Sequence, residues 1–486
     1  MQNEKIDLLL VLAPSPGISL NLGFDAQAMP PLGIGYIATY VSQFGYKVKL
    51  LDLSIPDNTL YELLEIVNAG TPQMIGISTT TETYNNGVCI AKALKEANKD
   101  YLIFMGGPHV TFEYIDALNT GYIDVVIRGE GEIVTKELCD YYIRQAGNLK
   151  DIQGISYKHN DKVISNPDAM LIQNLDDLPF PDRSFFELEK YPHKGNCSTS
   201  RGCPGTCIFC AASGLSGGKY RMRSAKSIVE EFKYLKSIGC NHIDIVDDTM
   251  TASLKRLNEI LDLLLEANLG VTWYCESRVD VVTKELLIKM QQAGLRLIQF
   301  GVEAGSQEML DCLKKHITLT QIENVFHWCR ELDILATSNM IIGQPYDTEK
   351  SIDDTIALAK KILSLGAHMN FTICTPFPGT YMWDHLEELG LKIVENNLDK
   401  YTTFYPVLET SNFSANELRN RYFKASLELL MHRKSATAMK EKGLIRFNEQ
   451  LLMASNFLRE QFTYYKVENE NLKSEGNYEQ QANYAL

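Results

Sequence analysis

The sequence has little of what marks a membrane-spanning or secreted protein. None of its 486 residues belongs to an uninterrupted apolar run as long as a membrane span, which needs roughly 18 such residues. The segment Met1 to Asp7 lacks the charge-then-apolar order of a secretory signal, so we expect a cytoplasmic location. Basic residues are also few, because 47 Lys and Arg against 61 Asp and Glu leave a formal net charge of −14. This acidic balance disfavours nucleic acid as a partner.

The cysteines show no pattern of paired bridges. There are eleven, an odd number, spread over a long chain, which favours reduced thiols over a disulfide framework. Five of them lie in apolar or helical contexts, where free cysteine packs as a small hydrophobe. The cysteines that we predict to be core residues are Cys89, Cys139, Cys240, Cys312 and Cys329.

Residues 1–145 alternate short apolar runs with helical patterns. The apolar runs are 6–13, 48–53, 74–78, 102–105 and 125–127, and the helical patterns lie near 33–44, 59–69, 86–98, 111–119 and 131–145. Short apolar strands separated by helices are typical of a parallel sheet covered on both faces. We therefore predict an α/β fold that begins with a doubly wound, Rossmann-type sheet. Ligands of such sheets bind at the carboxyl ends of the strands.

The loops after these strands are rich in glycine, proline and hydroxyl residues. They are residues 13–17, 78–81, 106–111 and 128–132. Glycine allows a ligand to approach the backbone closely, so the loops predict a binding edge. Ordinary strand-to-helix turns explain the same residues equally well.

The alternation stops at 146–195, which we predict to be a connector with a proline- and acid-rich part at 175–182, and restarts near 196. Strands are expected at 242–246, 271–274, 297–301, 336–342 and 370–375, with one more just before Cys203, and helices at 224–238, 252–267, 283–293, 320–332 and 349–365. Six strand–helix units predict a partial (β/α)6 barrel over 196–410, since a full barrel needs about 250 residues. We expect 411–465 to be helical and the polar segment 466–486 to be disordered.

Three cysteines stand close together at Cys203, Cys207 and Cys210 in a loop with glycine and proline at 202, 204 and 205. Thiolates at such short spacing are typical ligands of an iron–sulfur cluster. Three ligands leave one iron of a four-iron cube open for a small chelating molecule. Cys197 as a fourth ligand, a zinc site, which usually has four ligands, and three unligated cysteines remain as alternatives.

The three-cysteine loop, with the aromatic Phe209 before its last cysteine, resembles that of the radical S-adenosylmethionine (SAM) superfamily. The resemblance covers 196–410. It implies that SAM chelates the open iron of a 4Fe–4S cluster, and that one electron cleaves it to a 5′-deoxyadenosyl radical, which abstracts hydrogen from the substrate. An electron donor such as flavodoxin or ferredoxin is implied as well.

Further positions match the family at successive strand ends. The resemblance implies that Asp247 or Asp248 accepts bonds from the methionine amino group, that Arg278 pairs with the carboxylate, and that Glu303 bonds the ribose hydroxyls. A solvated or salt-bridged strand end explains each residue alone. Their arrival in order along the chain favours the cofactor interpretation.

The last two strand ends carry Gly343, in a turn that resembles the adenine-side turn of the family, and Pro376. Arg221 and Arg223 precede a helix that Ser224 is placed to cap. We interpret both arginines as surface residues, with contact to cofactor or substrate as the alternative.

The order of the two domains resembles the cobalamin-binding branch of this superfamily. The segments that carry the resemblance are 30–36, 106–111, 128–132 and 175–182. It implies cobalamin between the sheet and the barrel mouth, and methylation of an unactivated carbon in a small-molecule or peptide substrate. The residues expected at the cobalamin are Pro14, Ser78, Thr79, Gly106, Gly107, His109, Gly129 and Glu130.

One feature departs from many cobalamin domains: the Asp-x-His-x-x-Gly loop, whose histidine binds cobalt, is absent. The first histidine of the chain is His109. Members of this branch often lack that loop, and some relatives bind no cobalamin. We expect His109 to pack in its loop near the cofactor tail rather than to ligate cobalt.

Three other functions are alternatives to cobalamin-dependent methylation. A methylthiotransferase brings three further cluster cysteines in its first domain, but residues 1–196 contain only Cys89 and Cys139. A cobalamin-type enzyme that performs cyclisation or rearrangement would have the same sequence signature and stays open. A non-catalytic cobalamin or iron–sulfur carrier is disfavoured, because a carrier needs no ribose or adenine contacts.

Overall fold

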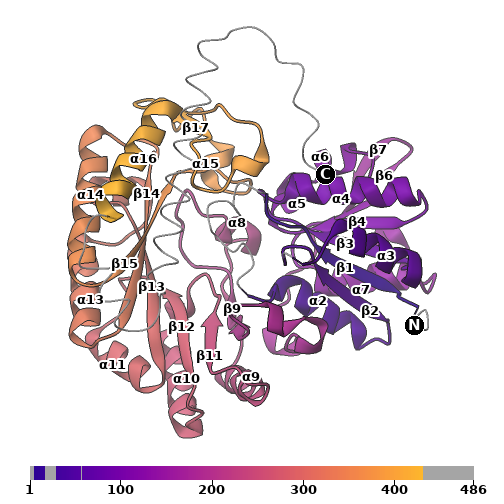
Figure 1. Ribbon diagram of the computed structural model, residues 1–486, viewed down its shortest axis with the longest axis horizontal. Coiled ribbons are helices and arrows are strands. Elements are labelled where there is room, and N and C mark those ends of the chain that lie inside the picture. Colours follow the sequence, from indigo (N-terminus) through magenta and orange to yellow (C-terminus); the bar gives the residue numbers. More distant parts are fainter. Residues whose placement is uncertain (1–4, 17–28, 56, 431–486) are drawn as a thin grey trace.

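The computed structural model describes residues 5–16, 29–55 and 57–430. It consists of two α/β units that lie next to each other (Figure 1). The first contains a seven-stranded sheet in the order β2-β1-β3-β4-β5-β6-β7, and the second a six-stranded sheet in the order β15-β14-β13-β12-β11-β8. The predicted fold class is thereby confirmed.

The first sheet is parallel from β1 to β5, as the apolar runs predict. Its strands are β1 (Leu8–Leu12), β2 (Val48–Asp52), β3 (Met74–Ser78), β4 (Leu102–Gly106), β5 (Val125–Ile127), β6 (Ile155–His159) and β7 (Lys162–Ser165). Its helices are α2 (Leu32–Ser42), α3 (Leu60–Gly70), α4 (Tyr84–Ala97), α5 (Pro108–Phe112), α6 (Tyr114–Asn119) and α7 (Glu132–Tyr142). Successive strand residues point to opposite faces, so Leu9 and Val11 pack under α3 and α4 while Leu8 and Leu10 pack under α2 and α7.

Part of the expected connector belongs to this sheet. β6 and β7 pair antiparallel with each other, and β6 pairs antiparallel with β5. Sequence reasoning missed this hairpin because it lies at the sheet edge, where polar residues such as Lys158, His159 and Lys162 break up any apolar run. The remainder of the connector is fixed to both units, since the buried Arg183 donates to Asn196 of the second unit and Tyr191 donates to Asp52 of the first.

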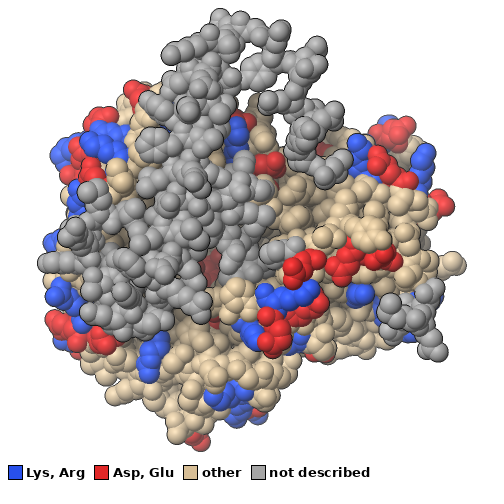
Figure 2. Space-filling model, viewed as in Figure 1, with Lys and Arg blue, Asp and Glu red and all other residues tan. Residues whose placement is uncertain are grey.

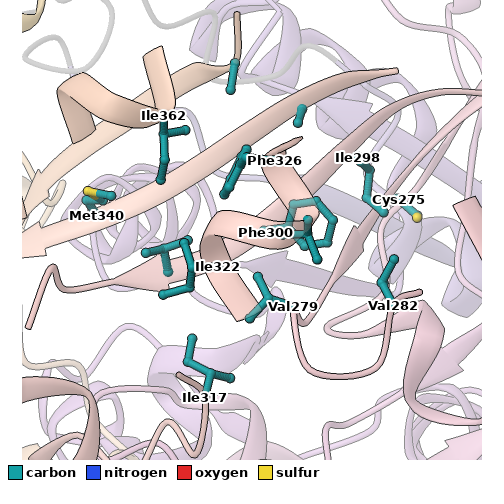
Figure 3. Packing of buried hydrophobic residues seen from close by; sticks show 14 of the residues in the cluster. Cys275, Val279, Val282, Ile298, Phe300, Ile317, Ile322, Phe326, Met340 and Ile362 are labelled. Carbon is teal, nitrogen blue, oxygen red and sulfur yellow. The ribbon is translucent and has the colours of Figure 1, made fainter. Parts of the chain in front are cut away.

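The second sheet is parallel at every strand pair, which makes it a partial barrel. Its strands are β8 (Asn196–Cys197), β11 (His242–Ile245), β12 (Thr272–Ser277), β13 (Leu295–Glu303), β14 (Leu335–Ile342) and β15 (His368–Ile373). Around it lie α9 (Ala225–Ser237), α10 (Leu254–Ala267), α11 (Lys284–Gln292), α12 (Gln307–Cys312), α13 (Leu319–Glu331) and α14 (Glu349–Ser364). The core lies between strands and helices, where Phe300 meets Phe326 edge-on with ring centroids 5.6 Å apart (Figure 3).

Shorter elements complete the described chain. They are the antiparallel pairs β9 (Ser200–Arg201) with β10 (Arg221–Met222) and β16 (Leu391–Ile393) with β17 (Leu408–Thr410), the helices α8 (Ala212–Ser216), α15 (Tyr381–Asp384) and α16 (Ala415–Leu430), and the 3-10 turns Leu149–Asp151, Leu175–Asp177, Arg183–Phe185, Leu188–Lys190, Met250–Ala252 and Leu398–Lys400. The helical prediction for 411–465 holds for α16. The residues after 430, including the expected disordered tail, lie outside the described residues.

The cysteine predictions are correct in part. Cys139, Cys240 and Cys329 are buried, but Cys89 is exposed and Cys312 is only half-buried. These two predictions are wrong because an apolar neighbourhood in sequence does not say which side of its helix a residue occupies. All eleven cysteines are free thiols in the structure.

Two general features bear on partners. Within the described segments, no helix is both long and apolar enough to cross a bilayer. The face shown in Figure 2 carries acidic and basic side chains close together rather than one broad basic area.

Candidate functional site

The loop with the three cysteines joins β9 to α8 at the carboxyl ends of the barrel strands. Gly205 lies between two of the sulfurs: a Cβ on this residue would stand 3.3 Å from Cys203 Sγ and 3.9 Å from Cys207 Sγ. The backbone N–H of Gly205 also donates to Cys203 Sγ at 3.3 Å. The bare glycine therefore lets the loop curl with its sulfurs converging and an amide aimed at one of them, as an iron–sulfur site requires.

Hydrogen bonds anchor the cysteine loop to other segments of the second unit. Ile208 donates its N–H to the carbonyl of Leu313 at 3.3 Å and accepts from the N–H of Met382 at 2.9 Å. Gly202 donates to Asp248 Oδ2 at 3.1 Å. Three separate segments of the second unit, after β11, after α12 and in α15, thus fix the loop that carries the cysteines.

Three thiolates from one short loop are a donor set typical of an iron–sulfur cluster. In the described part of the chain, no three His, Cys, Asp or Glu side chains gather around a point where one metal ion would sit. A four-iron cube instead takes each thiolate on a different iron. Cys197 is fully buried in the barrel core, which argues against its being a fourth ligand of the cluster. Burial raises the pKa of Cys207, and raises that of Cys210 to about 11, so metal binding must displace thiol protons.

The two acidic residues after β11 have different surroundings. Asp247 is buried and accepts bonds from the backbone N–H and the hydroxyl of both Thr199 and Ser200. Asp247 thus anchors the strand that leads to the cysteines, and its predicted contact with the cofactor stays a prediction. The carboxylate of Asp248 accepts from Gly202 alone among the described residues, and desolvation raises its pKa.

A compact ionic group lies beside Cys207. Lys315 Nζ is 2.9 Å from Glu303 Oε1, and both side chains are buried. Arg278 donates to the carbonyl of Lys315 at 2.8 Å and pairs with Asp280. Burial alone would lower the pKa of Lys315, but Glu303 and Cys207 raise it above its ordinary value. Of these residues, sequence analysis identified Glu303 and Arg278 but missed Lys315, which follows α12 and ends no strand.

Glu276 is a second residue that sequence analysis missed, although it stands two residues before Arg278. Its Oε1 accepts from Tyr274 at 3.2 Å and from Gln299 at 3.0 Å. Desolvation raises its pKa to about 7, helped by Asp248 and Glu303. A carboxyl group with this pKa next to a binding edge is a candidate functional group.

The remaining predicted SAM contacts line the same end of the barrel. Phe209 packs against the barrel core with Lys315 Nζ 5.9 Å from its ring centroid. Gly343 has a φ of +76°, and a Cβ there would come within 3.0 Å of Leu418 in α16. Pro376 is buried in the loop after β15.

A cavity of about 390 Å³ lies at the carboxyl edge of the first sheet. It is lined from the first unit by β-strand and α2 residues and closed from the barrel side by Ser198, Arg201 and Val246. Five of the eight residues expected at cobalamin line it, namely Ser78, Gly106, Gly107, Gly129 and Glu130. Its apolar wall also includes residues that carry no loop signal, such as Leu10, Ile34, Gly76 and Phe104.

The shape of the cavity depends on glycine, which has no side chain, at position 76. A Cβ on Gly76 would lie 2.2 Å from the ring of Phe104, so glycine lets this ring lie flat against β3. The adjacent backbone also depends on glycine, because Gly107 has a φ of +115° and a Cβ there would strike the carbonyl of Thr79 at 2.1 Å. A largely apolar cavity with a few polar groups, placed at a strand edge, suits the tail of a large organic cofactor.

Three of the expected cobalamin residues do not line the cavity: Pro14, Thr79 and His109. His109 is buried, contacts Thr81 at 3.2 Å and packs on Tyr84 with ring centroids 4.5 Å apart. Burial lowers its pKa to about 4, so it is neutral at pH 7. The packed role expected for this histidine agrees with these contacts.

Ion pairs join the two units at the cavity. Glu130 accepts from Arg201 at 2.7 Å and from Arg221 at 2.9 Å, and Arg201 also binds Glu132. Glu130, which lines the cavity, therefore also forms an interdomain contact. The surface interpretation of Arg221 and Arg223 is wrong: both are buried, and Arg223 pairs with the buried Glu231. Carboxylates of the adjacent unit and of α9, which the local sequence does not reveal as partners, attract both arginines to buried positions.

Comparisons with known proteins agree with this geometry. Residues 22–139 match the B12 binding domain family, and residues 197–359 match the radical SAM superfamily. An uncharacterized methyltransferase of Pyrococcus horikoshii is 33% identical over 434 residues, which are 88% of this chain and 93% of that protein. The chain belongs to the B12-binding radical SAM family.

Two more comparisons support the family and the fold. An anaerobic magnesium-protoporphyrin IX monomethyl ester cyclase of Rubrivivax gelatinosus is 29% identical, over 81% of this chain and 72% of that protein. The radical SAM methyltransferase TsrM of Kitasatospora setae, solved with cobalamin and a 4Fe–4S cluster, superposes with a TM-score of 0.70 at 16% identity, over 88% of this chain and 89% of that one.

Family membership confirms the predicted enzyme and its cofactors, a 4Fe–4S cluster, SAM and cobalamin. The carrier alternative falls with it. The assignment of individual residues to these cofactors stays a prediction that rests on the geometry above.

Proposed function

We propose that this B12-binding radical SAM enzyme transfers a methyl group to an unactivated carbon of a small molecule or peptide. The observation that carries the proposal is that the cavity of the first unit and the cysteine loop of the barrel adjoin each other. Arg201 lines the cavity of the first unit and stands two residues before Cys203 in the barrel loop. A reaction that needs a radical at one cofactor and a methyl group at the other requires this closeness.

The cofactors supply a 5′-deoxyadenosyl radical and a transferable methyl group, and the chain supplies position and exclusion of water. Cys203, Cys207 and Cys210 hold the cluster, with the amide of Gly205 turned toward a sulfur. Asp248, Arg278 and Glu303 offer charges that complement the amino, carboxylate and ribose groups of SAM. Ser78, Gly106 and Gly129 line the cavity that receives part of the cobalamin.

A second function, cyclisation or rearrangement without methyl transfer, is favoured by one specific observation. Relatives at 29% and 26% identity bear the name of a cyclase that acts on magnesium-protoporphyrin IX monomethyl ester. Their similarity to this chain extends over 81% of it, so both units are shared with them.

Product analysis separates the two functions. The anaerobically reconstituted enzyme is incubated with SAM and a one-electron reductant, and 5′-deoxyadenosine and S-adenosylhomocysteine are quantified. Methyl transfer predicts both products, since demethylated SAM is S-adenosylhomocysteine. The Cys207→Ala variant is the control for background cleavage. Release of 5′-deoxyadenosine without S-adenosylhomocysteine would favour the cyclase function, and release of neither would contradict the proposal.

A reducing partner belongs to this proposal. Flavodoxin or ferredoxin would supply the electron, in the cytoplasm, where free thiols persist. The acidic balance of the chain favours a small molecule or peptide over nucleic acid as substrate.

A further inference from the structure

A strained turn presents Lys315 to the cluster loop. Lys314 and His316, which flank Lys315, have φ values of +54° and +55°. Residues other than glycine in this region cost free energy, and such residues persist where the surrounding structure demands them. One left-handed residue on each side of a buried lysine indicates that the conformation of the turn directs that side chain inward.

The turn is clamped to the cysteine loop by its backbone as well. The carbonyl of Leu313 accepts from Ile208, which lies between Cys207 and Cys210, at 3.3 Å. The carbonyl of Lys315 itself accepts from Arg278 at 2.8 Å. These bonds fix the backbone of the turn against the cysteine loop, and the buried ammonium group of Lys315 lies 5.9 Å from the ring centroid of Phe209 in that loop.

Lys315 and Glu303 form an ion pair that lies against the backbone of Gly301. A Cβ on Gly301 would lie 2.5 Å from Glu303 Oε1 and 2.6 Å from Lys315 Nζ, so a side chain at this position would displace the pair. Glu303 is itself in the left-handed region, with a φ of +71°. The pair uses Oε1, and no donor from the described segments bonds Oε2, which leaves that oxygen available to a ligand.

We propose that Lys315 is a positioning residue with two effects: it fixes the Glu303 carboxylate for SAM, and its positive charge favours the reduced cluster. Three thiolates leave an oxidised four-iron cube with net negative charge. The one-electron donor, reduced flavodoxin or ferredoxin by class, converts [4Fe–4S]2+ to [4Fe–4S]+ and makes that charge more negative. A nearby ammonium group in a poorly solvated site stabilises the added charge.

The test measures the reduction potential and SAM affinity of the reconstituted enzyme. Lys315→Met should shift the cluster potential to a more negative value, in a titration followed by electron paramagnetic resonance, and should weaken SAM binding by about tenfold, the lower end of the effect of removing a residue that orients a ligand. Lys315→Arg should retain the potential, since it keeps the charge. Lys314→Met is the matched control, because Lys314 is exposed in the same turn and should change neither quantity.

A second variant, expected to shift the cluster potential in the opposite direction, distinguishes the role of Lys315 from loss of folding. Glu303→Gln removes the negative partner and should shift the potential to a less negative value, while still weakening SAM binding. Equal potentials in the wild type, Lys315→Met and Glu303→Gln would overturn the inference. It rests on the proposed cluster site, and the two fail differently: a wild-type protein that assembles no cluster defeats the proposed function, whereas clusters with equal potentials defeat only the role of Lys315.

Discussion

Gly76→Ala is the substitution that most directly probes the cavity. The added methyl group would meet the tip of the Phe104 ring at 2.2 Å, where ordinary contact is 3.4–4 Å. The ring must therefore retreat by more than about 1 Å, which overpacking data place at a cost of about 1–3 kcal/mol. Phe104 lines the cavity of about 390 Å³, so a displaced ring intrudes on the space meant for cobalamin.

We expect Gly76→Ala to fold and to bind cobalamin about tenfold more weakly, which corresponds to ~1.4 kcal/mol. The assay is an equilibrium titration of the protein with cobalamin, followed by absorbance. Gly33→Ala is the matched control, because Gly33 lines the same cavity but a Cβ there meets nothing within 4 Å.

A second substitution tests the cause. Combining Gly76→Ala with Phe104→Leu should restore much of the affinity, since leucine lacks the ring tip that the new methyl group strikes. Unchanged affinity in Gly76→Ala would refute the assignment of this cavity to cobalamin. Equal losses in Gly76→Ala and Gly33→Ala would refute displacement of the Phe104 ring as the cause.

Three further predictions concern the charged groups. Glu276 has a folded-state pKa of about 7 against 4.5 when unperturbed, so the folded state binds its proton more tightly and stability falls as pH rises from about 4.5 to 7, by on the order of 3 kcal/mol. Glu276→Gln should therefore raise the melting temperature of the metal-free protein at pH 8 and leave it unchanged at pH 4.5, and parallel melting curves across pH would speak against this. Asp247→Asn should destabilise the protein by about 2–3 kcal/mol in urea denaturation, because buried donors of Thr199 and Ser200 lose a charged acceptor, whereas Asp248→Asn should weaken SAM binding with little loss of stability; the reverse pattern would contradict the roles assigned here. Arg221→Met leaves the half-buried Glu130 with one fewer partner and should lower the protease resistance of the segment around Ile172, whose carbonyl Arg221 also binds. Unchanged proteolysis would argue against this tether.

Sequence patterns predicted the sheets because buried parallel strands need continuous apolar runs, as in Met74–Ser78. The three cysteines were found for a similar reason, since one short loop carries them all. The edge hairpin β6–β7 lacked an apolar run and was missed. The fold class, and the three-cysteine pattern from which cluster ligands are predicted, are thus local properties of the chain that its sequence displays.

The contacts that sequence analysis did not foresee all depend on tertiary structure. Glu130 lines the cavity as expected, but its ion pairs with Arg201 and Arg221 form only where the two units meet. Asp247 was predicted at SAM, and in the structure its oxygens accept from the Thr199–Ser200 backbone. Lys315 lies in a turn with no motif, and its importance depends on its distance from Glu303.

The central claim is that three thiolates hold a 4Fe–4S cluster whose fourth iron binds SAM. It is tested most directly by electron paramagnetic resonance of the reduced, reconstituted protein with and without SAM. We predict the signal of one such cluster per chain, changed in shape when SAM is added. A signal that SAM leaves unaltered, or protein that takes up zinc in place of iron at Cys203, Cys207 and Cys210, would contradict the account.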